Sequence, residues 1–250
     1  SGPELEFTGA TWVAITGADM DPHLNGQGIL MNTAVDVRPG DRLGFRGLKS
    51  GCRAYIAFAG GIAVPPVMGS RSTYLRTGIG GFQGRALMPG DELPLGEPKG
   101  KPRLKKIPEG LIPDYKHEQT IRIISGPEAH YFEIVGLRSF LSTEYTVTAQ
   151  SDRMGYRLSG EPIQHKEGMT NIISAGISLG TVQVPGDGQP IILMADRQTS
   201  GGYARIANVI TVDLTLLAQM RPGDIVRFSE TTLDSARQLY LNRMTELNGR

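Results

Sequence analysis

Short alternating runs of apolar and polar residues dominate the hydrophobic pattern of this chain. The runs are rich in β-branched or aromatic side chains, and clusters of glycine and proline separate them. Alternation with a period of two residues is the pattern of a strand whose two faces differ. It predicts strands at residues 12–15, 55–58, 120–124, 144–148, 191–194 and 208–212. Their regular spacing favours barrels or sandwiches over alternating βα units.

Three turns share the sequence Arg/Met-Pro-Gly-Asp and interrupt the pattern, at residues 38–41, 88–91 and 221–224. Proline presets φ at the second position of a turn and glycine accepts a positive φ at the third, which is the signature of a type II turn. A short alternating run follows each turn, so further strands are predicted at 42–45, 92–95 and 225–228. The loop at residues 184–190 resembles these turns.

Few segments have the periodicity of a helix. One short helix is predicted at residues 213–219, with Asp213 as its cap and Pro222 beyond its end. A longer helix is predicted at the C-terminus, where Thr231 and Asp234 resemble a capping box. One face of this helix carries Leu233, Ala236, Tyr240, Met244 and Leu247.

The stretch 97–117 differs from the rest because it is rich in proline and lysine. Such a composition is typical of an exposed linker. It divides the chain into a first half, residues 1–96, and a second half, residues 118–250. The 250 residues suffice for two small β domains, each with its own core. The predicted fold is therefore mainly β, with two barrel-like halves, a few short helices and a C-terminal helix.

Composition argues against several classes of function. The formal net charge is +1 and no basic run carries interleaved aromatic residues, so no nucleic-acid partner is expected. The single cysteine, Cys52, excludes an intrachain disulfide and a cysteine-based zinc site, and the four histidines have no metal-ligand spacing. The chain has no apolar run of membrane-spanning length, and residues 1–7 do not resemble a signal peptide. We therefore expect a cytoplasmic protein with no membrane partner and no metal.

The densest group of polar side chains follows the strand predicted at 191–194. It offers an acceptor, a forked donor, an amide and a hydroxyl in Asp196, Arg197, Gln198 and Thr199. Gly201 and Gly202 follow and permit a ligand to approach the backbone closely; Tyr203 ends the segment. The alternative is a tight connection between strands whose polar groups bind their own backbone.

A second group lies in the glycine-rich region 69–85, which includes Arg71, Ser72 and Thr73. It is not a Walker A loop because no Gly-Lys-Ser/Thr ends it, and no helical pattern follows that would suit a dinucleotide site. A long glycine-rich loop is often functional, but a surface loop that needs positive φ angles is the alternative.

A third group is formed by residues 151–157, with Asp152, Arg153, Tyr156 and Arg157. Its arginines suit a carboxylate or phosphate ligand, since a guanidinium binds either with two parallel hydrogen bonds. The alternative is that Asp152 is their structural ion-pair partner.

Three blocks carry a resemblance to a known family: residues 57–62 with 67–74, residues 151–158, and residues 180–185 with 196–203. Together they resemble the KipA / allophanate hydrolase subunit 2 family, which is also called the biotin-dependent carboxyltransferase family and includes the C-type subunits of 5-oxoprolinases. The resemblance runs from about residue 2 to the final helix. It implies two cyclophilin-like β barrels. Members usually begin with a further N-terminal segment, so the first barrel is expected to lack that segment.

The resemblance also implies a bacterial hydrolase made of several subunits. The partners would be a KipI-like protein of the B type and a LamB/YcsF-like protein of the A type, and the complex would open 5-oxo-L-proline to L-glutamate with ATP. This chain is not expected to be active alone. Two alternatives come from the same family. One is a KipA-type regulatory protein that antagonises a KipI-like kinase inhibitor, and the other is a carboxyltransferase that moves a carboxyl group from carboxybiotin to urea or a similar amide.

We assign site roles from the chemistry of the three polar groups. Arg71, Arg153 and Arg197 would hold a carboxylate or a phosphorylated intermediate. The hypothesis makes Asp196 the residue that orients Arg197 or assists proton transfer, with Gln198 and Thr199 bound to the substrate amide. The residues expected at the catalytic centre are Asp196, Arg197, Gln198 and Thr199. Those expected to bind substrate are Arg71, Ser72, Thr73, Asp152, Arg153, Tyr156, Gly201, Gly202 and Tyr203.

Overall fold

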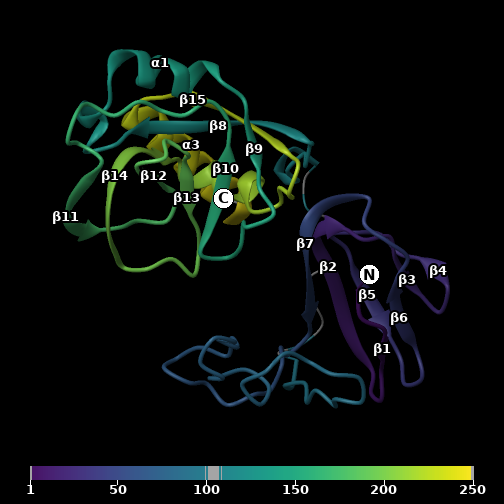
Figure 1. The fold of residues 1–250 in the computed structure, drawn as a ribbon. Coiled ribbons are helices and arrows are strands. Elements are labelled where there is room, and N and C mark those ends of the chain that lie inside the picture. The colour runs from purple at the N-terminus through teal and green to yellow at the C-terminus, as the bar shows by residue number, and fades with distance from the viewer. Residues whose placement is uncertain (1, 99, 101–106, 108, 249–250) are drawn as a thin grey trace. The chain divides into compact units, whose positions relative to one another are not determined.

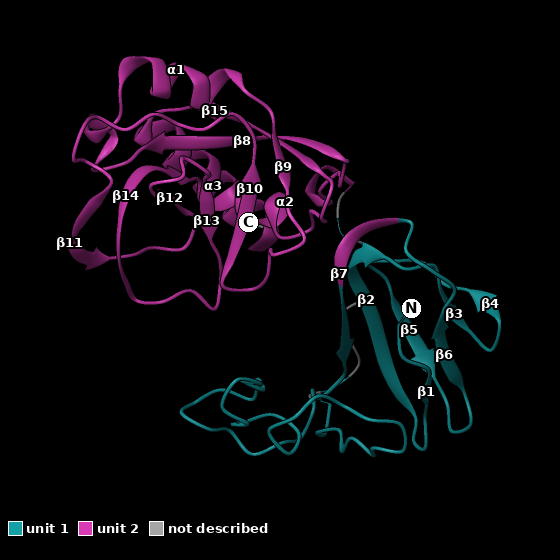
Figure 2. Ribbon diagram, viewed as in Figure 1, with its two compact units in different colours: residues 1–49, 54–107 teal, residues 50–53, 108–250 magenta. Residues whose placement is uncertain are grey.

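The computed structural model describes residues 2–98, 100, 107 and 109–248. The chain divides into two compact units, one formed by residues 1–49 and 54–107 and the other by residues 50–53 and 108–250 (Figure 2). The division falls within the predicted linker, 97–117. Of that linker, residues 99, 101–106 and 108 lie outside the described residues, and the remainder includes a short 3₁₀ helix, η1, at Glu109–Leu111.

The first unit contains two small sheets. One has the strand order β1-β6-β3-β4 and the other the order β5-β2-β7. Their strands are β1 Leu5–Glu6, β2 Thr11–Asp19, β3 Pro22–Leu24, β4 Gln27–Gly28, β5 Ala34–Val37, β6 Arg42–Phe45 and β7 Ser50–Phe58. Residues 50–53 of β7 belong to the second unit. Val13 and Ile15 of β2 are buried with Phe7, Val37 and Leu43 in one core, because alternate residues of a strand share a face. The pairings found among the described strands leave both sheets open.

The second unit contains a closed barrel of seven strands (Figure 1). The pairing runs β14-β12-β13-β10-β9-β15-β8 and returns to β14 through a direct β14–β8 pair. These strands are β8 Glu118–Ser125, β9 Tyr145–Val147, β10 Gly155–Ser159, β12 Thr181–Val184, β13 Ile191–Leu193, β14 Ser200–Val209 and β15 Ile225–Glu230. The strand β11, Asn171–Gly176, pairs with β14 outside this ring. All the barrel's pairs are antiparallel except β15 with β8.

Three α-helices accompany the barrel: α1 Ile134–Ser142, α2 Leu214–Leu217 and α3 Leu233–Asn248. Two 3₁₀ helices, η2 Ala129–Tyr131 and η3 Thr211–Asp213, precede the first two. The mainly β fold and the C-terminal helix are therefore as predicted. No helix in the described part of the chain is long and apolar enough to cross a membrane.

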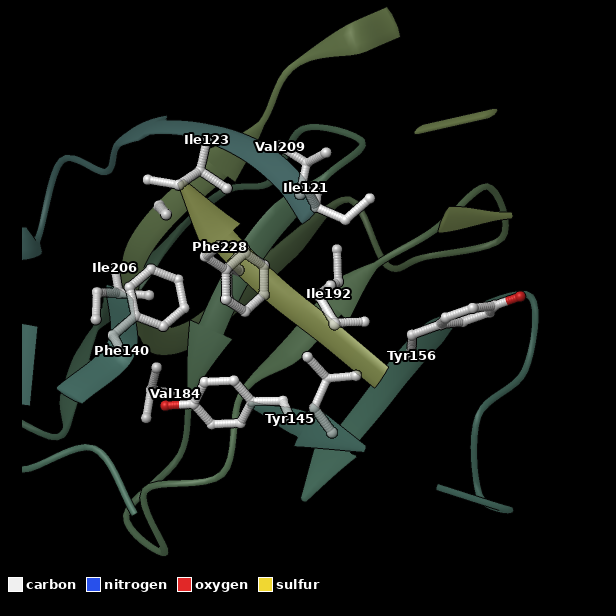
Figure 3. Packing of buried hydrophobic residues seen from close by; sticks show 14 of the residues in the cluster. Ile121, Ile123, Phe140, Tyr145, Tyr156, Val184, Ile192, Ile206, Val209 and Phe228 are labelled. Carbon is white, nitrogen blue, oxygen red and sulfur yellow. The ribbon is translucent and has the colours of Figure 1, made fainter. Parts of the chain in front are cut away.

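Inward-facing side chains of the barrel strands form the core of the second unit (Figure 3). Phe228 of β15 lies 4.5 Å from Phe140 of α1 and 5.9 Å from Tyr145, measured between ring centroids. These aromatic contacts attach the helix to the barrel. Ring pairs at such distances stabilise a fold beyond the apolar area that they bury.

The three Pro-Gly-Asp turns have the predicted backbone, with φ of +88° at Gly40, +89° at Gly90 and +94° at Gly223. Their aspartates have a role that the turn pattern did not reveal. In each turn a carboxylate oxygen accepts a hydrogen bond of 2.7 Å from the N–H of the first turn residue, in the pairs Arg38–Asp41, Met88–Asp91 and Arg221–Asp224. The aspartate side chain therefore adds a hydrogen bond between the last and the first residue of its own turn.

Several predicted elements need correction. Residues 92–95 form no strand and contribute only the bridge between Leu95 and Ile62, because Pro94 has no N–H for a sheet ladder. The strand predicted at 208–212 ends at Val209 and gives way to η3. The side chain of Asp213 does not cap a helix. Its carboxylate instead accepts three hydrogen bonds of 2.6–2.9 Å from Arg122.

The final helix also differs in detail from its prediction. Thr232, rather than Thr231, supplies the cap, since its hydroxyl oxygen accepts the N–H of Ser235 at 3.2 Å. The apolar face predicted for α3 is not buried in its unit, and Leu233, Tyr240, Met244 and Leu247 are all exposed. The helix α1 and the strands β10–β12 were not predicted, because their apolar runs are short or interrupted by glycine.

Candidate functional site

Two of the predicted polar groups are neighbours in the second unit. Pairing of β10 with β13 places Gly155 opposite Leu193, so the segments just outside these strands lie side by side. The N–H of Asp196 donates to the carbonyl of Arg153 at 2.8 Å, and the N–H of Met194 donates to the carbonyl of Met154 at 2.9 Å. The barrel therefore joins residues 151–157 and 194–199 into one polar surface.

The central contact of this surface is an ion pair between Arg153 and Asp196. Nε and Nη2 of Arg153 donate to the two carboxylate oxygens of Asp196 at 2.8 and 3.0 Å. This two-bond geometry holds both side chains in fixed orientations. Asp152 has a different use, because its Oδ1 accepts the N–H groups of Met154 and Gly155 at 2.8 and 3.2 Å. The ion pair joins the segment before β10 to the segment after β13. The alternative considered in the sequence had made Asp152 the ion-pair partner of Arg153.

Arg197 lies beside this ion pair and has different contacts. Its Nε donates to the carbonyl of Ile177 at 3.3 Å and its Nη1 lies 3.5 Å from the carbonyl of Met194. Among the described residues no carboxylate pairs with Arg197, and the carboxylate predicted to orient it belongs to the pair with Arg153. These two acceptors are neutral carbonyl oxygens, so the guanidinium of Arg197 has the chemistry to bind an anionic ligand.

Gln198 and Thr199 complete this part of the surface. Both are exposed, and the carbonyl of Thr199 accepts the N–H of Ile177 at 3.0 Å. The backbone of the connection is thus tied to the end of β11 while its side chains face solvent. An exposed amide and hydroxyl beside an arginine can hydrogen-bond an amide or a carboxylate.

The two glycines are strand residues in this structure, since β14 begins at Ser200. A Cβ atom at Gly201 would lie 2.5 Å from Cδ1 of Ile177 and 2.9 Å from Nε2 of Gln183. At Gly202 the nearest atom to such a Cβ would be 3.5 Å away. Gly201 therefore makes room for two packed side chains, and Tyr203 follows as an exposed residue opposite Asn171.

Gln183 was not singled out by the sequence. It is only 1% exposed, and its Nε2 donates to the carbonyl of Tyr203 at 3.3 Å. A buried polar side chain beneath a candidate site needs a specific partner to offset its desolvation. The sequence feature that could have indicated a buried role for Gln183 is its position between Val182 and Val184.

Tyr156 points into the protein and not toward the polar surface. Its hydroxyl accepts a hydrogen bond of 2.6 Å from Arg53 and donates one of 3.1 Å to the carbonyl of Met220. Burial raises the pKa of Tyr156, although the hydrogen bond from Arg53 opposes this shift. In this structure Tyr156 supports the unit from within.

The remaining predicted residues belong to the glycine-rich loop of the first unit. Nε of Arg71 donates to the carbonyl of Val64 at 3.0 Å, and the N–H of Ser72 is bound by the hydroxyl of Ser70 at 3.1 Å. Thr73 packs so closely against Gly81 that a Cβ there would collide with it. The structure therefore places the predicted site residues in two sets, one in each unit.

An ion pair stiffens this loop. Nη1 and Nη2 of Arg85 each donate to a carboxylate oxygen of Asp91 at 2.7 Å, and the guanidinium carbon lies over the Phe82 ring, 5.7 Å from its centroid. Arg85 lowers the pKa of Asp91 to about 2. The glycines of the loop have positive φ angles, as a surface loop with tight turns requires.

The first unit also has a shallow apolar depression of about 310 Å³. None of the predicted site residues lines it. Its lining residues are Trp12, Val13, Ala14, Ala34, Ala57, Phe58, Ala59, Gly60, Pro98 and Gly100. Within the described ranges, no group of three or more histidine, cysteine, aspartate or glutamate side chains could hold a metal ion.

Comparison with known proteins identifies the class to which this architecture belongs. The sequence model of the carboxyltransferase domain, subdomain A and B, matches residues 1–230, and the chain therefore belongs to that family. The C-type subunit of Escherichia coli 5-oxoprolinase is 40% identical over 93% of this chain and 73% of its own length. The Haemophilus influenzae protein of the same name is 36% identical over 95% of this chain and 75% of its length. The family resemblance found in the sequence is thus confirmed.

A solved structure shows the same fold. The Kluyveromyces lactis urea amidolyase superimposes on all of this chain with a TM-score of 0.91 and 30% identity. This chain corresponds to 16% of that much longer protein. The fold is accordingly that of a carboxyltransferase domain, which occurs both in separate subunits and within large enzymes.

Proposed function

We propose that this chain is the C-type subunit of a cytoplasmic, ATP-dependent 5-oxoprolinase. Together with KipI-like (B-type) and LamB/YcsF-like (A-type) subunits it would open 5-oxo-L-proline to L-glutamate. The observation that supports this proposal is the 40% and 36% identity to two bacterial proteins named as the C-type subunit of 5-oxoprolinase, over more than nine-tenths of this chain.

The reaction breaks the C–N bond of the lactam and adds one water. The hydroxyl goes to the carbonyl carbon, the nitrogen takes the proton, and ATP hydrolysis supplies the driving force. The substrate presents a carboxylate and an amide, and the surface at residues 196–199 offers groups complementary to both. In the proposal Arg197 binds the carboxylate, while Gln198 and Thr199 bind the lactam amide.

Arg153 and Asp196 act as a positioning pair in this proposal, because their two mutual hydrogen bonds fix the connection that carries Arg197. Asp196 is also proposed to assist proton transfer. Tyr203, which is exposed on β14, is proposed to contribute a further substrate contact. ATP is a co-substrate of the whole complex, and the loop 69–85 lacks the ending of a Walker A motif.

Reconstitution tests the proposal. Purified A- and B-type subunits are incubated with ATP and 5-oxoproline, with and without this chain, and glutamate is measured. We expect glutamate formation to require this chain and to fall strongly with Arg197→Ala. The matched control is Arg138→Ala, which removes an exposed arginine from α1. Equal glutamate formation with and without the chain would exclude the proposed role.

A second candidate function is transfer of a carboxyl group from carboxybiotin to urea or a similar amide. The likeness of the whole chain to part of the K. lactis urea amidolyase favours it. A product that forms only with biotin and disappears with avidin would identify this activity. If the chain instead binds a KipI-like protein in pull-down experiments without any turnover, a KipA-type regulatory function is supported.

A further inference from the structure

Three polar side chains of the second unit form a hydrogen-bonded cluster beside the candidate site. Oγ of Ser178 lies 2.7 Å from Oδ1 of Asn208 and 3.0 Å from Oγ1 of Thr181. Oγ1 of Thr181 lies 2.9 Å from the same oxygen of Asn208. Thr181 is only 3% exposed and Asn208 is partly buried, whereas Ser178 is exposed. Ser178 is therefore the member of the cluster that a ligand can reach.

The backbone holds Ser178 next to the segment that carries Arg197. Ser178 follows Ile177, whose carbonyl accepts Nε of Arg197 at 3.3 Å. The N–H of Ile177 donates to the carbonyl of Thr199 at 3.0 Å. These two bonds attach the residue before Ser178 to the segment 196–199 at two points. Ser178 therefore lies at the edge of the polar surface that this segment forms.

The hydrogen bonds of the cluster determine where its hydroxyl protons lie. Nδ2 of Asn208 donates to the carbonyl of Val209 at 3.1 Å, so Oδ1 faces the two hydroxyls, and this oxygen can only accept. The hydroxyls of Ser178 and Thr181 each donate to it directly or through the other hydroxyl. In every one of these arrangements both protons stay within the cluster. Oγ of Ser178 is therefore left with a lone pair, and without a proton, for a ligand.

We propose that Ser178 binds the substrate by accepting a hydrogen bond from the N–H of the lactam. This inference rests on the proposed function, because it adds a contact to the same substrate. The substrate 5-oxoproline presents a carboxylate, an amide carbonyl and one N–H. Arg197 suits the carboxylate, and the donors of Gln198 and Thr199 suit the carbonyl, but the N–H needs an acceptor. Oγ of Ser178 has this chemistry, because the acceptor oxygen of Asn208 engages its proton.

The fixed polarity of the Ser178 hydroxyl makes this residue selective between ligands. A freely rotating hydroxyl binds a donor or an acceptor on the ligand equally well. Held by Asn208, Oγ of Ser178 favours the lactam over the corresponding lactone, in which a ring oxygen replaces the N–H and would face a lone pair. Because Ser178 is exposed, water replaces part of the lost bond, and the expected selectivity is moderate.

Competition in the reconstituted assay tests this contact. Glutamate formation from 5-oxoproline is measured with the γ-lactone of 2-hydroxyglutarate as inhibitor. We expect Ser178→Ala to raise KM for the lactam about 3- to 10-fold with little change in kcat, because one neutral hydrogen bond is lost from substrate binding. The inhibition constant of the lactone should stay unchanged or fall. Ser178→Thr keeps the hydroxyl and should keep the selectivity. Ser142→Ala is the matched control, since Ser142 is an exposed serine of α1 whose hydroxyl donates to the carbonyl of Arg138.

A second variant separates the orientation of the hydroxyl from its presence. Asn208→Leu removes the acceptor of the cluster, so Ser178 becomes free to donate to the lactone oxygen. We expect the selectivity for the lactam to fall although Ser178 remains, with folding checked by circular dichroism.

The outcomes distinguish this inference from the proposed function. An unchanged ratio of the lactone inhibition constant to the lactam KM in Ser178→Ala would overturn the inference. So would an equal change of that ratio in Ser142→Ala. In both cases wild-type glutamate formation that requires this chain would still support the proposed function. If no glutamate formation requires the chain, the proposed function and this inference are both wrong.

Discussion

The guanidinium of Arg205 binds the carboxylate of Glu128 through two hydrogen bonds of 2.6 Å, although 77 residues separate them in the chain. Both side chains are largely buried, and Nη1 of Arg205 also donates to the carbonyl of Gly176 at 2.8 Å. The pair therefore connects η2 with β14 and with the end of β11. A buried ion pair of this kind is costly to break, because the remaining charge loses its partner.

The first prediction concerns the acid stability that this pair confers. Arg205 lowers the pKa of Glu128 below its ordinary value. A carboxyl whose pKa is lowered by folding stabilises the folded state above its unfolded pKa, and this contribution is lost as the pH falls through the folded pKa. Glu128→Gln is expected to cost about 3 kcal/mol near pH 7 and progressively less at acid pH.

Urea unfolding at a series of pH values, followed by circular dichroism, measures this difference. Glu118→Gln is the control, because Glu118 forms an exposed ion pair with Arg227. Water and salt screen such a pair, so its removal should change stability little. A difference between wild type and Glu128→Gln that stays constant from neutral to acid pH would contradict the prediction.

The second prediction compares two buried tyrosines. The hydroxyl of Tyr145 is buried without a hydrogen-bond partner among the described residues, and burial raises its pKa to about 12. Tyr156 is also buried, but its hydroxyl binds Arg53 and Met220. In Figure 3 the Tyr145 ring lies beside Val184 within the cluster, whereas Tyr156 extends away from it.

Removal of the two hydroxyls should therefore have opposite effects. Tyr145→Phe is expected to leave stability unchanged or raise it by about 1 kcal/mol, since it deletes an unsatisfied polar atom. Tyr156→Phe is expected to lower stability by about 1–2 kcal/mol, because it leaves a donor of Arg53 without its acceptor. Thermal unfolding measures both. Equal losses in the two variants would show that the Tyr145 hydroxyl is satisfied in solution.

The third prediction concerns the adjacent glycines at the start of β14. Gly201→Ala introduces a Cβ 2.5 Å from Ile177 and 2.9 Å from Gln183, so one or both side chains must move. Overpacking of this kind costs about 1–3 kcal/mol. Gly202→Ala, whose Cβ has 3.5 Å of clearance, is the matched control. If chemical unfolding shows the two variants to be equally stable, the packing role of Gly201 is wrong.

The fourth prediction concerns the pair Arg153–Asp196. In the reconstituted assay, Arg153→Ala and Asp196→Asn should each slow glutamate formation about 10- to 100-fold, because loss of the pair releases the connection that carries Arg197, and a displacement of about 1 Å can cost about 100-fold in rate. If the two residues act as one positioning unit, the double variant should be little worse than either single variant. Retained activity in Arg153→Lys would argue against a role for the two-bond geometry, which lysine cannot reproduce. Fully additive losses would assign the two residues independent roles.

The fold was predictable where local chemistry determines it. The turns at Gly40 and Gly223 need only proline, glycine and a following alternating run, and the strands after them formed as expected. The same pattern failed at 92–95, where Pro94 cannot donate to a ladder. The alternation could not show that β14 and β8 pair to close a barrel, because strand pairing depends on contacts between distant segments.

The candidate site, like the fold, was predictable in part from local sequence and in part only from the tertiary structure. The sequence by itself determined which segments are polar and glycine-rich, the short strands that flank them, and the family to which they belong, since these depend on residue types and spacing along the chain. Only the tertiary structure decided that Arg153 pairs with Asp196 while Asp152 closes its own turn. It also showed that Gly201 makes room for Gln183 and that Ser178 shares a hydrogen-bonded cluster with Asn208. Such partnerships depend on barrel closure, which brings residues that are distant in the sequence within hydrogen-bonding distance.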